Sequence, residues 1–179
     1  MNYKIGTRGS KLALAQADLV RTRLQEAYPE DTFELKVIRT KGDQLKDVPL
    51  GKIGDKGTYV REIEEQILEG KIQLGVHSMK DMPSQPALGL VFAKAWKRED
   101  ARDVLILRKE KSLSDLPEGA VIGTGSMRRK FQLLAMRRNI QIVDIRGNVD
   151  TRLKKMQEQK LDGIVLAAAG LKRLGMEQI

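Results

Sequence analysis

The sequence predicts an α/β protein with two domains whose sheets are mixed but mostly parallel. Apolar, strand-like segments alternate with segments of helical periodicity along the whole chain, which is the pattern of βαβ units. The length of 179 residues is enough for one large or two small domains. The charged stretch Lys97–Asp103 marks the boundary. We therefore expect one domain over residues 1–98 and a second over 99–179.

The first half is predicted to contain four strands and two helices. Ser10 can cap the first helix, which runs to about Tyr28 and ends before Pro29. Leu12, Ala15, Leu19, Val20 and Leu24 would form its buried face, and Val60, Ile63, Ile67 and Leu68 that of the second helix. The predicted strands are Asn2–Thr7, Thr32–Thr40, Leu74–Ser78 and Leu88–Trp96.

The second half repeats strand and helix more regularly. The predicted strands are the segments DVLILR, AVIGT, IQIVDI and DGIVLAA. The predicted helices run from Ser126 to about Arg138, from Asn148 to about Gln159, and through Leu174. This order favours a mostly parallel sheet.

Composition excludes several classes of site. The chain has no cysteine, so disulfides, thiolate metal sites and cysteine nucleophiles are absent from these residues. With one histidine, His77, neither a histidine-rich metal site nor a serine triad is supported, and we predict no metal. There is no apolar run of about 18 residues and no leader pattern at the N-terminus, so we expect a cytoplasmic protein without a membrane partner.

The positive charge is concentrated in the second half. Residues 1–100 contain 17 Lys and Arg against 15 Asp and Glu, whereas residues 101–179 contain 16 against 9. Nucleic acid is the usual partner of a basic chain, but only 4% of residues are aromatic, too few for a base-stacking platform. A smaller polyanion is the alternative partner for this charge.

The segment GTGSMRRKFQLLAMRR carries the strongest local signal for an anion site. A strand passes through a glycine turn into a helix, whose first N–H groups can bind an anion. Arg128 and Arg129 lie in the first turn, where the helix dipole disfavours cations, so a functional reason is indicated. Arg8, Arg146 and Arg152 also follow strands, and such ends meet at one edge of a parallel sheet. Arg137 and Arg138, at the helix end, suit a structural role.

Three other segments allow alternative interpretations. Gly123 and Gly125, followed by Asp144, imitate a dinucleotide fingerprint, but Arg128 stands at the third glycine position. The loop GKIGDKGTYVRE is either a basic flap or a plain surface loop. In VHSMKDMPS, Asp81 is either a carboxylate held in a crevice, able to act in acid–base chemistry, or half of a Lys80–Asp81 surface pair.

Taken in order, seven motifs resemble the porphobilinogen deaminase family, also called hydroxymethylbilane synthase. They are TRGSKLALAQA, IRTKGD, GDKGTYVREIE, VHSMKDMPS, GTGSMRRKFQL, DIRGNVDTRL and LAAAGLKRLG, and they span essentially the whole chain. The resemblance implies two periplasmic-binding-protein-like domains with a cleft between them. It also implies a transferase of tetrapyrrole (haem) biosynthesis that joins four porphobilinogen units head to tail, releases ammonia, and is primed by a dipyrromethane cofactor.

The resemblance also assigns roles to individual residues. Asp81 would be the catalytic carboxylate, and Lys52 and Lys56 would belong to a flap over the site. The residues expected to bind the cofactor are Arg8, Ser10, Asp43, Lys80, Thr124, Ser126, Arg128, Arg129, Arg146 and Arg152. Those expected to bind substrate are Arg8, Gln16, Arg146, Arg152 and Arg173.

The chain departs from the family pattern in two places. Gly125 occupies a position often held by serine, for which we expect a modest effect. The family's third domain, with the cysteine that carries the cofactor, and the segment that completes the first domain would lie beyond Ile179. We therefore expect a two-domain part that is poorly active or inactive alone, and the resemblance implies a monomer. A non-catalytic module that binds carboxylates or other anions is the main alternative, followed by a dinucleotide-binding domain.

Overall fold

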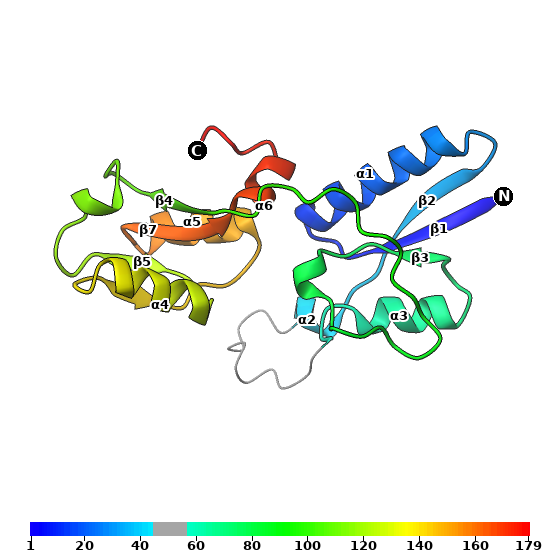
Figure 1. The fold of residues 1–179 in the computed structure, drawn as a ribbon, viewed down its shortest axis with the longest axis horizontal. Helices are drawn as coiled ribbons and strands as arrows, with labels where there is room; N and C mark the ends of the chain where they lie inside the picture. The colour runs from blue at the N-terminus through cyan, green and yellow to red at the C-terminus, as the bar shows by residue number, and fades with distance from the viewer. Residues whose placement is uncertain (45–56) are drawn as a thin grey trace. The chain divides into compact units, whose positions relative to one another are not determined.

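The computed structural model describes residues 1–44 and 57–179, which belong to two compact units, Met1–Lys97 and Arg98–Ile179 (Figure 1). Each unit has one sheet with helices on both faces. The predicted fold class, α/β with mixed and mostly parallel sheets, is confirmed. No helix in the described ranges is long and apolar enough to cross a membrane.

Unit 1 contains a parallel sheet of order β2-β1-β3. β1 (Asn2–Thr7) is central and pairs with β2 (Thr32–Val37) on one side and β3 (Leu74–Gly75) on the other. Two longer helices, α1 (Lys11–Ala27) and α3 (Arg61–Leu68), lie on opposite sides of this sheet in Figure 1. The short α2 (Lys41–Gln44) and the 3₁₀ helix η2 (Met79–Asp81) follow β2 and β3.

The described core of unit 1 contains one cluster of buried isoleucines. Ile38, Ile63 and Ile72 form this cluster, with Ile67 packed against it. Gly6 permits this packing, because a Cβ there would collide with the Ile72 side chain and lie 3.2 Å from Ile63 Cγ2. The sheet and α3 can therefore approach closely only with glycine in the middle strand.

Several sequence predictions for unit 1 are wrong in detail. No strand forms over Leu88–Trp96, where the chain is irregular and the Leu88 side chain is 97% exposed. A strand needs a hydrogen-bonded neighbour, and among the described residues none pairs with this segment. β3 stops at Gly75 because its ladder with β1 ends there. Leu19 and Leu68, predicted to be buried, are exposed.

Unit 2 has a four-stranded sheet of order β4-β7-β5-β6. The strands are β4 (Asp103–Leu107), β5 (Val121–Gly123), β6 (Gln141–Val143) and β7 (Gly163–Ala167). The helices are α4 (Met127–Met136), α5 (Val149–Glu158), α6 (Ala168–Arg173) and the 3₁₀ helix η3 (Leu113–Asp115). β5 pairs in parallel with β6 and β7, whereas β4 runs antiparallel to β7.

Both faces of the unit 2 sheet are covered by apolar side chains. Successive residues of β7 point to opposite faces, so Ile164 packs with Met156 of α5 and Leu171 of α6. Val165 packs on the other face with Leu133 of α4. Each of these clusters contains more buried residues than the cluster of unit 1. The ends of the strands are thereby held on a rigid layer.

Candidate functional site

The two units build the turn after a central strand in a similar way. In unit 1, β1 ends at the fully buried Thr7, and the Ser10 side chain caps α1 by accepting from the Ala13 N–H at 3.2 Å. In unit 2, β5 is followed by the buried Thr124, and Ser126 caps α4 by accepting from the Arg129 N–H. Both turns lie at the carboxyl ends of parallel strands, where α/β proteins bind ligands.

Arg8 in unit 1 is held by a carboxylate and an aromatic ring. Its Nε donates to Asp43 Oδ1 at 3.1 Å, its Nη2 donates to the same carboxylate, and its Cζ lies 4.2 Å from the Tyr59 ring centroid. Thr40 also donates to Asp43, through its hydroxyl at 2.9 Å. Burial raises the pKa of Asp43, but the bonds and charge of Arg8 and the bonds from Thr40 outweigh it and lower that pKa. Asp43 therefore holds the Arg8 guanidinium in place through hydrogen bonds and opposite charge.

Gln16 and Ser78 connect α1 with the segment after β3. The Ser78 hydroxyl donates to Gln16 Oε1 at 2.8 Å. Ser78 also accepts, through its carbonyl, the Asp81 N–H at 2.9 Å and so begins the 3₁₀ turn that carries Lys80 and Asp81. The predicted substrate residue Gln16 thus helps to fix the position of the predicted catalytic residue.

Asp81 and Lys80 are both exposed in the structure, so the partial burial expected for Asp81 is not observed. No ion pair joins the two among the residues the structure describes. His77, by contrast, is largely buried. Burial first, and then the charge of Arg8, lowers the pKa of His77 to about 4, so this imidazole is neutral at pH 7.

Arg128 and Arg129 in unit 2 share one carboxylate. Arg128 Nη2 donates to Asp103 Oδ2 at 2.8 Å, and Arg129 Nη2 donates to Asp103 Oδ1 at 2.6 Å. The Arg129 side chain is 14% exposed and also donates to the Val165 carbonyl, whereas the Arg128 side chain is 60% exposed. The structure therefore brings together the two arginines that the sequence selected, and adds an aspartate that it did not.

The remaining predicted arginines are distributed around the same unit. Arg146 and Arg152 follow β6, the neighbour of β5, and Arg152 Nε donates to the Gly147 carbonyl at 2.7 Å. Arg146 has no hydrogen-bond or ion-pair partner within residues 1–44 and 57–179. Arg173 is the last residue of α6, so it lies away from the strand end at which that helix begins. The flap residues Lys52 and Lys56 lie outside the described residues.

Gly125 lies against the side chain of Asp144. A Cβ at this position would lie 2.7 Å from Asp144 Oδ1 and 3.4 Å from the Ile145 carbonyl oxygen. The Asp144 carboxylate thus lies where a serine side chain would stand. Because it is the end of an exposed side chain, it can move aside for a larger residue at 125.

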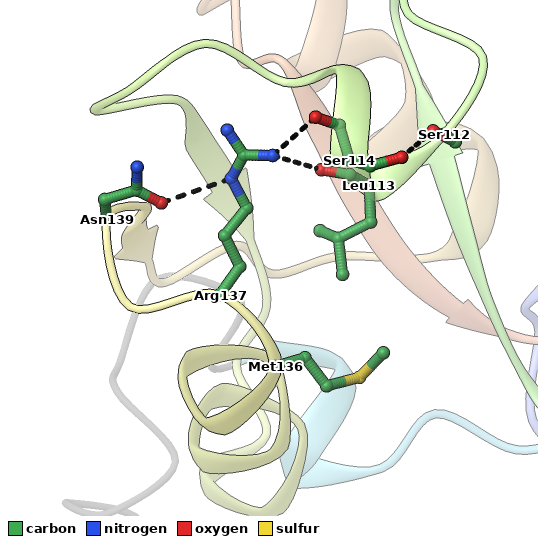
Figure 2. A pocket seen from close by; sticks show the side chains of 6 residues that line it. All are labelled: Ser112, Leu113, Ser114, Met136, Arg137 and Asn139. Carbon is green, nitrogen blue, oxygen red and sulfur yellow. Dashed lines mark hydrogen bonds between the residues drawn. The ribbon is translucent and has the colours of Figure 1, made fainter.

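A pocket of about 540 Å³ in unit 2 lies away from this edge (Figure 2). It is lined by Ser112, Leu113, Ser114, Met136, Arg137 and Asn139, which precede the amino ends of β5 and β6 or end α4. Arg137 binds the carbonyls of Leu113, Ser114 and Leu116, as the dashed lines for the first two show. Its guanidinium donates to backbone carbonyls, which fits the structural role predicted for it.

Among the described residues, no group of three or more His, Asp and Glu side chains could hold a metal ion. The described residues of the candidate site offer guanidinium forks, turns with threonine and serine, and one exposed carboxylate.

Comparison with known proteins identifies the family. Residues 3–179 match the family model described as "Porphobilinogen deaminase, dipyromethane cofactor binding domain". The chain belongs to the porphobilinogen deaminase family. It is 63% identical to the porphobilinogen deaminase of Lachnospira eligens over 98% of this chain, and 58% identical to that of Clostridioides difficile over 99%. The chain spans 60% and 59% of the lengths of these two relatives.

Similarity to solved structures is much more distant. The periplasmic aliphatic sulphonate binding protein SsuA of Escherichia coli is 16% identical, with a TM-score of 0.45 over 98% of this chain and 54% of that one. An ancestral arginine-binding protein bound to arginine is 14% identical, with the same TM-score over 97% and 74%. Likeness at this level supports no statement about the ligand of this chain.

The residues of unit 2 fit the dipyrromethane cofactor of this porphobilinogen deaminase domain. Asp103 shows that the forks of Arg128 and Arg129 take up a carboxylate in hydrogen-bonding geometry. The acetate and propionate groups of a dipyrromethane present the same chemical group. One signal for Asp103 is visible in the sequence, an acid at the start of an apolar strand, but the antiparallel pairing that carries it to this edge is not.

Proposed function

We propose that this chain supplies the cofactor-binding and catalytic residues of an enzyme that polymerises four porphobilinogen molecules into hydroxymethylbilane. The observation that carries the proposal is the pair Arg128 and Arg129 at the start of α4, which already binds a carboxylate. Each pyrrole of the growing product carries two carboxylates, so guanidinium forks at a strand edge suit every intermediate in the series.

Binding in this proposal is shared among residues with different mobility. Arg8 and Arg129 have side chains that are mostly buried and are fixed by internal partners. Arg128 and Arg146 keep donors that the described residues do not occupy, and Thr124, Ser126 and Ser10 order the turns beneath them. Lys80, Arg152 and Arg173 would add charge. Charged hydrogen bonds are worth about 1.5–3 kcal/mol each, so a few of them suffice to orient a pyrrole.

Asp81 is proposed as the catalytic carboxylate. Its side chain is exposed and carries no internal ion pair in the described part of unit 1, so both oxygens can face a ligand. It would hydrogen-bond the aminomethyl nitrogen of porphobilinogen as this group leaves as ammonia, and its charge would stabilise the cationic pyrrole. The dipyrromethane supplies the primer to which the first unit is joined.

The test measures porphobilinogen consumption and ammonia release by the complete enzyme. Asp81→Asn should lower turnover about 10²–10⁴-fold, the usual contribution of a positioned acid or base. Asp115→Asn is the matched control, because Asp115 is likewise an exposed aspartate that ends a 3₁₀ helix. It should change turnover less than twofold.

Two results would overturn the proposal. Near-normal turnover in Asp81→Asn would remove its catalytic role. Binding of dipyrromethane without any porphobilinogen consumption by the unmodified enzyme would support the non-catalytic carboxylate-binding module instead.

A further inference from the structure

A single antiparallel strand brings a carboxylate to the edge of the unit 2 sheet at which the parallel strands end. The carboxyl ends of β5, β6 and β7 lie at one edge of the sheet, because these strands are parallel. β4 runs the other way and pairs its first residue, Asp103, with Ala167, the last residue of β7. Asp103 therefore stands at the carboxyl edge only because β4 is reversed.

At that edge, Asp103 links two guanidinium groups of unequal mobility. Its two oxygens accept from different arginines, Oδ2 from Arg128 at 2.8 Å and Oδ1 from Arg129 at 2.6 Å. Arg129 has a second fixed bond, from Nη1 to the Val165 carbonyl at 3.1 Å, and its Nε is buried without a partner in the described residues. Arg128 has a second bond only to the exposed Gln132, at 2.8 Å.

We infer that Asp103 is a positioning residue for carboxylate binding, which holds the guanidinium groups of Arg129 and Arg128 in place before a ligand arrives. This inference rests on the proposed function, because the ligand is the carboxylate-bearing dipyrromethane or its extended products. Asp103 itself does not touch the reacting atoms.

Asp103 has two opposing effects on an arriving anion. It cancels part of the positive charge of the two arginines, which weakens attraction, and it fixes two long side chains before the ligand arrives. Ordering one such side chain on binding costs about 0.5–1.5 kcal/mol, so preordering two of them saves more than partial screening at an exposed edge removes. Positioning is therefore the larger effect.

The ionisation of Asp103 agrees with this role. Burial raises the pKa of Asp103, but the hydrogen bonds and charges of Arg129 and Arg128 outweigh it and lower that pKa. The carboxylate is therefore ionised at neutral pH, and both bonds are available whenever a ligand is.

The first experiment titrates the chain with free dipyrromethane bearing acetate and propionate groups, by calorimetry. Asp103→Asn keeps the shape of the side chain and removes its charge, and affinity should fall about ten- to a hundredfold. Asp103→Glu restores the charge one methylene further out and should recover part of the loss. Asp100→Asn is the matched control, because Asp100 pairs with the exposed Arg102 two residues away, and the affinity of this variant should stay within twofold of the unmodified chain.

The second experiment needs no ligand. The guanidinium N–H signals of Arg128 and Arg129 in an NMR spectrum should be separate and slowly exchanging in the unmodified chain and in Asp100→Asn. In Asp103→Asn they should merge with those of exposed arginines. A protein that is merely less stable would lose its amide dispersion as well, so the amide spectrum separates positioning from unfolding.

Tighter dipyrromethane binding by Asp103→Asn would overturn the inference, because Asp103 would then be only a competing anion. Unchanged arginine signals in Asp103→Asn would overturn it too. If the unmodified chain binds no dipyrromethane, the proposed function fails, while the arginine spectrum still decides whether Asp103 positions the two side chains.

Discussion

Unit 1 and unit 2 use the same turn but place their arginines differently. Both turns have a buried threonine at the strand end and a serine that caps the next helix. In unit 1 the arginine, Arg8, precedes the cap and is enclosed by Asp43 and Tyr59. In unit 2 the arginines follow the cap, and Arg128 remains 60% exposed. Unit 1 therefore presents an enclosed fork, whereas unit 2 presents a fork whose outer arginine is exposed.

The two units also differ in how much apolar surface supports these turns. Among the described residues, the buried cluster of unit 1 contains three isoleucines, whereas unit 2 has a larger cluster on each face of its sheet. Unit 1 additionally exposes Leu88 and Val91 in an irregular segment. We therefore expect unit 1 to be the less stable of the two.

The largest expected effect is the loss of stability of unit 1 after a substitution in its core. Ile63 is fully buried, so Ile63→Ala should cost about 2–5 kcal/mol of unfolding free energy. Amide hydrogen exchange should show lost protection in β1, β2 and α3, with β5 and β7 retained. Ile179→Ala, at an exposed position, is the control. Equal loss of protection in both units would contradict the proposed difference in stability.

The next largest effect is expected when Asp43, the carboxylate that holds Arg8, loses its charge. Asp43→Asn leaves a mostly buried guanidinium without its counter-charge, which should destabilise unit 1 by about 2–3 kcal/mol in urea unfolding. Asp18→Asn breaks the exposed pair with Arg21 and should cost less than about 1 kcal/mol. Equal effects of the two variants would show that Arg8 is not fixed by its pair.

A pH titration sharpens the comparison, because the only histidine lies in unit 1. The pKa of His77 is lowered to about 4 in the folded chain from an ordinary value of 6.5. The unfolded chain therefore binds the proton first as the pH falls, and stability present above pH 6.5 is lost progressively down to about pH 4. By pH 5 the loss should be about 2 kcal/mol.

His77→Gln tests this loss. Urea unfolding of the unmodified chain and of His77→Gln should give curves of stability against pH that differ by the histidine contribution between pH 6.5 and 4. Parallel curves over this range would mean that His77 is accessible to protons in the folded state.

The smallest expected effect concerns the turn of unit 2. Gly125→Ser should destabilise the chain by less than about 1 kcal/mol, because the end of the exposed Asp144 side chain can move away from the added Cβ. Combining it with Asp144→Ser should recover part of this loss. Thermal unfolding of both single variants and the double variant measures this coupling, and strict additivity would show that the two residues do not compete for space.

The sequence predicted local features well and pairings poorly. Ser10 was correctly predicted as a helix cap, since capping depends only on neighbouring residues. The strand over Leu88–Trp96 was wrong, because its apolar pattern says nothing about whether a neighbouring strand is present. Hydrophobic periodicity also gave the wrong result at Leu68, which is exposed. Its spacing along the helix matches the buried positions, but spacing does not show where the packing surface ends.

In the candidate site, too, residues that depend on local sequence were predicted, and a residue that depends on strand pairing was not. Arg128 and Arg129 could be selected from sequence because they break a local rule at a helix start. Asp103 could not, since its partners are 25 and 26 positions away and its location depends on the direction of β4. The exposure of Asp81 agrees with one of the two interpretations that the sequence left open, because local sequence alone did not decide between a crevice and the surface.

The central claim is that the arginines at the start of α4 bind carboxylates of a dipyrromethane. Calorimetric titration of this 179-residue chain with free dipyrromethane tests it most directly, with NAD and a DNA duplex as comparison ligands. We predict saturable dipyrromethane binding that is lost in the double variant Arg128→Ala with Arg129→Ala and kept in Arg138→Ala, an exposed arginine just beyond α4. Unchanged binding in the double variant, or binding of NAD or DNA in place of dipyrromethane, would contradict the claim.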